Sequence, residues 1–186
     1  VFADLAARQL AALAGLGALR HLDLDLVGID QVLGGHAKAA GSDLLDRRTQ
    51  RVAILHFDVA LDPEFARNQR IYLSFAEGRG DGMNGTSVAR AKLGAQGLED
   101  VTVIFRQQPA MKGGHHFGSR LVFGRDGHLF VTLGDRNTGR DKVQLLDNHI
   151  GKVVRIDRDG KAPADNPYLK QAGALPEIWS VGHRNI

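Results

Sequence analysis

The chain has 186 residues, of which 43% are hydrophobic and 24% are charged, and its formal net charge is +3. This is the composition of an ordinary globular protein, and no dense Lys/Arg block with interleaved aromatics points to a nucleic-acid partner. The absence of cysteine excludes disulfides, thiolate chemistry and Cys-ligated zinc within these residues. No apolar run approaches the roughly 20 residues that a membrane-spanning helix needs.

Residues 1–51 differ in pattern from the rest of the chain, which divides it into an N-terminal segment and a second region at 52–186. Leucines three residues apart favour a helix in the first segment, although Gly15 and Gly17 weaken it. These leucines are Leu10, Leu13, Leu16, Leu19 and Leu22. The segment has no basic lead-in, so it is not typical of a signal peptide.

From about residue 52 onward, short apolar stretches alternate with turns, which is typical of a β protein rich in glycine. The expected strands lie in DVALDPEF, RIYLSFAE, SVARAKL, VTVIFRQ, SRLVFG, HLFVTLGD, KVVRIDRDG and EIWSVGHRN. Between SRLVFG and HLFVTLGD, the sequence Arg125-Asp126-Gly127 predicts a hairpin turn.

The two halves of this region resemble each other. Asp62 lies 64 residues before Asp126, and Arg90 lies 65 residues before Arg155. Repeated units of about four strands favour a β-propeller, while a sandwich with similar hairpins is the alternative. Because a propeller ring generally needs at least about four blades, we expect residues 52–186 to form part of one, about two blades.

Two histidines, His115 and His116, stand just before the strand expected in SRLVFG, separated from it by Phe117 and Gly118. Neighbouring residues on a strand point to opposite faces, so one of the two can face a site while the other faces solvent. A neutral imidazole is the usual base for taking a hydroxyl proton near pH 7. A solvated or capping histidine is the alternative interpretation.

Asp135 follows the next strand, and a hairpin would return it to the side of His116. A carboxylate bonded to an imidazole fixes the tautomer of the ring and raises its basicity. An aspartate that ends a strand by accepting hydrogen bonds from turn amides is the alternative.

Arg184 and Asn185 come after the last expected strand, in the sequence GHRN. The planar guanidinium suits carboxylates and carbonyls, and the amide adds a donor and an acceptor, so this pair can hold a planar anion. A turn with a surface arginine is the alternative. The sequence DRDGK at 157–161 lacks most ligands of a calcium loop, so we interpret it as a hairpin turn and predict no metal site.

Six stretches, in this order, resemble the soluble PQQ-dependent sugar dehydrogenases. They are DVALDPEFARNQRIYLSFAE, NGTSVARAKL, VIFRQQP, GHHFGSRLVFGRDGHLFVTLGDR, HIGKVVRIDRDGKAPADNPY and ALPEIWSVGHRN. The likeness is strongest to the bacterial aldose sugar dehydrogenases, related to soluble quinoprotein glucose dehydrogenase. It extends from about Asp58 to the end, about 70% of the chain. It implies a six-bladed propeller with pyrroloquinoline quinone (PQQ) in a funnel.

The resemblance also implies roles for individual residues. His116 takes the place of the catalytic base, which removes a proton from the anomeric hydroxyl of an aldose while hydride passes from C1 to the quinone, giving a lactone. Asp135 takes the place of the carboxylate that orients this base. Arg184 and Asn185 take the places of PQQ contacts, and Arg184 would stabilise charge on the reduced quinone. We therefore expect His116, Asp135 and Arg184 around one hollow.

The chain also departs from the family. Where the family has a Gln-Gly-Gly-Leu-Leu-like run, this sequence has RVAILHF, and residues 1–50 do not resemble the family's first blade. Calcium is a further expected cofactor, but the family's calcium ligands follow the position of Asn185, so we expect none here.

The expected partners are an aldose substrate and an external electron acceptor, with the oligomeric state left open. The resemblance implies a periplasmic or secreted protein. Two alternatives remain: a non-catalytic propeller module that binds a carbohydrate or a protein, and an inactive truncated fragment.

Overall fold

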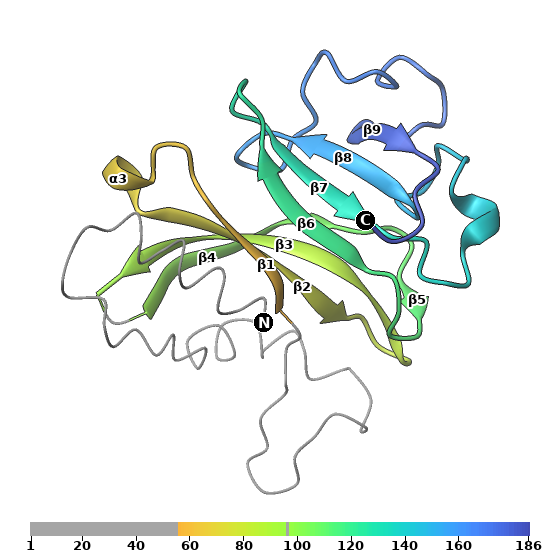
Figure 1. The fold of residues 1–186 in the computed structure, drawn as a ribbon, viewed down its shortest axis with the longest axis horizontal. Coiled ribbons are helices and arrows are strands. Elements are labelled where there is room, and N and C mark those ends of the chain that lie inside the picture. The colour runs from red at the N-terminus through yellow and green to blue at the C-terminus, as the bar shows by residue number, and fades with distance from the viewer. Residues whose placement is uncertain (1–55, 96) are drawn as a thin grey trace, which may run out of the picture.

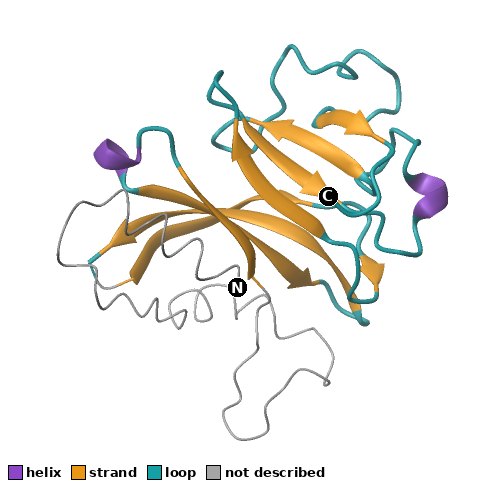
Figure 2. Ribbon diagram, viewed as in Figure 1, coloured by secondary structure: helices purple, strands orange, loops and turns teal. Residues whose placement is uncertain are grey.

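The protein is described by a computed structural model covering residues 56–95 and 97–186, so the expected N-terminal helix lies outside the described residues. Two antiparallel sheets form the structure (Figures 1 and 2). The first contains, in spatial order, β1 (His56–Leu61), β2 (Arg70–Gly78), β3 (Met83–Gly94) and β4 (Gly97–Arg106), and β5 (Met111–Lys112) also pairs with β3. The second contains β6 (Gly118–Phe123), β7 (Leu129–Leu133), β8 (Lys152–Ile156) and β9 (Ile178–Val181).

Helical structure in the described part is confined to connections between strands. Helix α3 (Phe65–Asn68) joins β1 to β2, and the 3₁₀ turn η3 (Arg140–Lys142) lies between β7 and β8. Within the described ranges, neither is long and apolar enough to cross a membrane.

All eight stretches expected to contain strands do so, and the alternation of buried and less buried residues is clear on β7. On β7, Leu129, Val131 and Leu133 are buried on one face while the residues between them are only partly buried. The predicted turn between β6 and β7 is also present. Gly127 adopts φ 79°, which favours glycine, and Asp126 accepts a hydrogen bond from the backbone N–H of His128 at 3.1 Å.

The internal repeat corresponds to the two sheets. Arg90 lies on β3 and Arg155 on β8, the third strand of each sheet, while Asp62 and Asp126 follow the first strands. Four strands of each sheet form a meander in chain order, as in consecutive propeller blades. The prediction of a mostly β chain forming about two blades of a propeller is confirmed.

The two sheets pack face to face through one hydrophobic core. Tyr72, Val88 and Phe105 of the first sheet contact an apolar face of the second sheet that includes Leu129 and Val131. Hydrogen bonds also join the beginning of β6 to the first sheet. The Ser74 hydroxyl donates to the Ser119 carbonyl at 2.6 Å, and the Leu121 N–H donates to the Asp58 carboxylate at 2.8 Å. These bonds hold the start of β6, next to the two histidines, against the first sheet.

Candidate functional site

His116 lies just before β6 and Asp135 just after β7, so the hairpin brings them together. His116 Nδ1 is 2.7 Å from Asp135 Oδ1. The carboxylate is nearly inaccessible, with 3% of the side chain exposed, while the imidazole retains 23%. The contact anticipated from the hairpin is therefore present, with the ring partly open to solvent.

The backbone around this pair is tightly packed. The Gly134 N–H donates to the Phe117 carbonyl at 3.0 Å, and the Arg136 N–H donates to the His116 carbonyl at 3.3 Å. A Cβ at position 134 would overlap the His116 carbonyl and lie 3.0 Å from the Arg184 carbonyl oxygen. Glycine at this position thus lets three chain segments meet at the site.

Asp135 is held as an ionised carboxylate. Burial raises its pKa, but hydrogen bonds from His116 and from the Asn137 N–H, with the charges of His116 and Arg140, outweigh burial and lower the pKa below its usual value. The Asn137 N–H lies 2.7 Å from Asp135 Oδ1. In the neutral form of the ring, an ionised acceptor favours the tautomer with its proton on Nδ1, which leaves Nε2 of His116 with a free lone pair.

The C-terminal residues of the chain return to this site. The Asp135 N–H donates to the Arg184 carbonyl at 2.7 Å, and the Thr132 hydroxyl donates to the Ile186 carbonyl at 2.8 Å. The His183 N–H donates to the Gly151 carbonyl at 3.1 Å. In Figure 1 the chain end accordingly lies beside β7.

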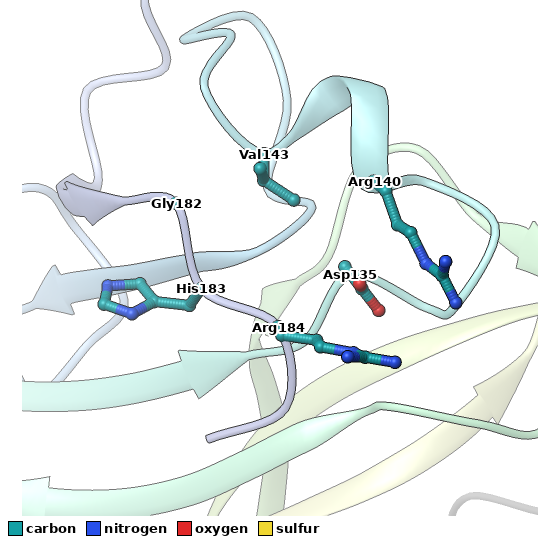
Figure 3. Close-up of a pocket in the computed structure, with 6 residues that line it drawn as sticks. All are labelled: Asp135, Arg140, Val143, Gly182, His183 and Arg184. Carbon is teal, nitrogen blue, oxygen red and sulfur yellow. The ribbon is translucent and has the colours of Figure 1, made fainter.

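A hollow of about 190 Å³ lies beside Asp135. It is lined by Asp135, Arg140, Val143, Gly182, His183 and Arg184. Figure 3 shows the side chains of Asp135, Arg140 and Arg184 extending to the same side, whereas the His183 ring points the other way. No ion pair joins either of these guanidinium groups to a carboxylate within the described ranges, so both remain able to bind an anion.

The predicted residues are brought together in part. Asp135 and Arg184 line the hollow, whereas His116 is not a lining residue and is joined to it only by its hydrogen bond to Asp135. Asn185 is exposed and does not line the hollow.

The sequence analysis missed Arg140, five residues after Asp135. Arg140 begins the short 3₁₀ turn η3, and only its proximity to Asp135 along the chain could have indicated it.

The predicted turn in DRDGK is present: Asp157 Oδ1 accepts hydrogen bonds from the Asp159 and Lys161 N–H groups. Among the residues that the structure describes, no three His, Asp or Glu side chains are grouped to hold a metal ion.

Comparisons with known proteins identify the family. A family model described as "Glucose / Sorbosone dehydrogenase" matches residues 55–186. The chain belongs to the glucose/sorbosone dehydrogenase family. Over 130 residues it is 45% identical to the aldose sugar dehydrogenase YliI of Escherichia coli, a match that covers 69% of this chain and 35% of that protein.

Solved structures of the family have the same fold. The apo form of the soluble aldose sugar dehydrogenase of E. coli matches with a TM-score of 0.68 and 43% identity, over 71% of this chain and 38% of that one. The PQQ-bound aldose sugar dehydrogenase of Streptomyces coelicolor matches with a TM-score of 0.59 and 26% identity, over 70% and 36%. The chain thus spans little more than a third of the length of these relatives.

Proposed function

We propose that the protein carrying this chain oxidises aldose sugars at C1 to lactones, with PQQ as cofactor and an external electron acceptor. The observation that supports this most directly is the 2.7 Å contact between His116 Nδ1 and the buried Asp135 carboxylate, beside a hollow lined by two arginines. The support from relatives is that family members are named dehydrogenases and that one solved relative is PQQ-bound.

In this proposal His116 is the general base. Asp135 accepts a hydrogen bond from Nδ1–H and keeps the ring in one orientation, so Nε2 is available to take the proton of the anomeric hydroxyl. The lowered pKa of Asp135 keeps it ionised at neutral pH, which stabilises the imidazolium formed after proton transfer. PQQ, when bound, supplies the two-electron acceptor for the hydride that leaves C1.

The donor set beside Asp135 fits an anionic cofactor. Arg140 and Arg184 present guanidinium groups toward the hollow, and such groups bind carboxylates and carbonyl oxygens through paired N–H donors (Figure 3). The hollow is smaller than the 300 Å³ or more that is roughly typical of small-molecule pockets. We therefore assign these residues to one wall of the cofactor pocket rather than to the whole of it.

The test compares the two adjacent histidines. The assay uses the protein as expressed from its gene, reconstituted with PQQ, and follows dye reduction with several aldoses. His116→Ala should lower kcat by about 100- to 10,000-fold, the usual contribution of a general base. His115→Ala is the matched control, because His115 is exposed and its ring makes no hydrogen bond within the described ranges. It should cost far less activity.

Thermal denaturation of both variants separates chemistry from folding. The proposal for His116 fails if His116→Ala retains its turnover, or if His115→Ala loses more activity than His116→Ala at equal stability. A PQQ-loaded wild type that reduces no dye with any aldose would instead favour a non-catalytic binding module.

A further inference from the structure

Arg136, the residue after Asp135, is a buried cation without a carboxylate partner among the described residues. It is 2% exposed, and its guanidinium donates only to neutral oxygens. Burial, together with the charge of Arg79, lowers its pKa to about 10. Burying a charge without a counter-ion is costly, so the neutral hydrogen bonds of this group must offset that cost.

The acceptors of Arg136 belong to two separate parts of the structure. On the first sheet, Asn84 accepts through its carbonyl at 3.2 Å and through its side-chain oxygen at 2.6 Å. In the loop before β6, the carbonyls of Gly113 and His115 accept at 2.6 and 3.1 Å. The guanidinium also lies 3.8 Å from the centre of the Phe117 ring. Arg136 thus fastens the loop at 113–117 to the first sheet.

His116 needs such support because its backbone is in an unfavourable conformation. Its φ is 50°, in the left-handed region, where a non-glycine residue is retained only when its surroundings impose it. Residues 113–115 are exposed, so little else packs against that side of the loop. Asp135 and Arg136 support His116 in different ways. The carboxylate holds the ring, while the guanidinium binds the His115 carbonyl on one side of it and packs on the Phe117 ring on the other.

We propose that Arg136 is a positioning residue for His116. Its planar fork of donors joins the 113–117 loop to Asn84 and so keeps the His116 imidazole on Asp135, with Nε2 directed for proton transfer. The positioning itself depends only on the described contacts, and its effect on turnover rests on the proposed function. Arginine suits this position because a single planar guanidinium can donate both to Asn84 on the first sheet and to the carbonyls of the 113–117 loop.

The first readout needs neither cofactor nor substrate. An imidazole Nδ1–H bonded to a carboxylate gives a downfield proton resonance, which NMR of the cofactor-free protein with isotope-labelled histidine can detect, and His116→Ala assigns it by its loss. Arg136→Met, which keeps the length and removes the donors, should abolish or broaden this resonance. Arg136→Lys keeps the charge but not the fork, so the resonance should weaken less.

The second readout is kinetic. In the PQQ-loaded protein, Arg136→Met should lower kcat by about 10-fold or more while KM changes little, because misplacing a reacting group affects the chemical step. It should also shift the acidic limb of the pH profile for kcat. Arg136→Lys should recover part of the rate, and it provides the comparison if the methionine variant does not fold.

Arg155→Met is the matched control. Arg155 is also buried, makes several hydrogen bonds and lies over an aromatic ring, but its partners are in the hairpin turn and the loop after β8. This variant should lose stability without changing the His116 resonance or the pH profile.

The inference is overturned if Arg136 variants keep both the resonance and the wild-type kcat, or if Arg155→Met alters both readouts equally. If Arg136→Met loses the resonance but His116→Ala keeps full activity, Arg136 still positions the His116 imidazole. In that case His116 is not the catalytic base.

Discussion

Lys152 is a buried residue whose ammonium group bonds to carbonyls of the loop beside the candidate site. Its side chain is fully buried, and Nζ donates to the carbonyls of Lys142, Val143 and Ile150 at 3.1, 3.0 and 2.6 Å. Val143 also lines the hollow. Burial lowers the pKa of Lys152 from 10.5 to about 8, although the charge of Asp147 opposes this shift.

This shift predicts a pH dependence of stability. Between pH 8 and 10.5 folded Lys152 loses its proton while the unfolded chain keeps it, so the unfolded state binds more protons and stability rises with pH. The free energy of unfolding, relative to a Lys152→Met variant, should rise by up to about 1.4 kcal/mol per pH unit in this window. Urea denaturation at several pH values measures it, and parallel curves for the two proteins would contradict it.

At the level of elements, the repeat places arginines at corresponding positions in different environments. Arg155 on β8 bonds to Asp126 of the hairpin turn at 2.6 Å and to Asp165 of the following loop at 2.7 Å, and 4% of its side chain is exposed. Arg90 on β3 pairs with Asp159, whose side chain is 62% exposed. Arg155 therefore joins three segments of the second sheet, while the Arg90 pair lies at the surface.

Truncating the two arginines should separate these roles. Arg155→Ala should lower the free energy of unfolding by about 1–3 kcal/mol, because several hydrogen bonds of a buried guanidinium are lost and the turn and loop are released. Arg90→Ala should cost about 0–1 kcal/mol, as expected of an exposed ion pair. Chemical denaturation gives both values, and equal losses would show that the burial of Arg155 does not matter.

At the level of the whole molecule, the two sheets share one core and should unfold together. Leu129 is fully buried at their interface, beside Tyr72 and Val88 of the other sheet. Neither face would be covered if its partner sheet separated, and such exposure of apolar surface is unfavourable.

Leu129→Ala should therefore destabilise both sheets, by about 2–5 kcal/mol. Hydrogen exchange should detect equal losses of protection on β3 and on β8. Val122→Ala, on the same hairpin but 52% exposed, is the control and should change stability by less than about 0.5 kcal/mol. Loss of protection confined to the second sheet would mean that the two sheets unfold independently.

The sequence by itself determined the strands, the repeat and the proximity of His116 to Asp135. Strand alternation and turn chemistry act over a few residues, and a hairpin must return Asp135 to the start of β6. Only the tertiary structure decided that Arg140 joins Arg184 on the hollow and that Arg136 is buried against Asn84. Arg136 and Arg184 lie on irregular segments and Arg140 begins a single short 3₁₀ turn, so no sequence periodicity indicates their positions. Those positions depend on which distant carbonyls and strand ends the packing of the two sheets brings within reach.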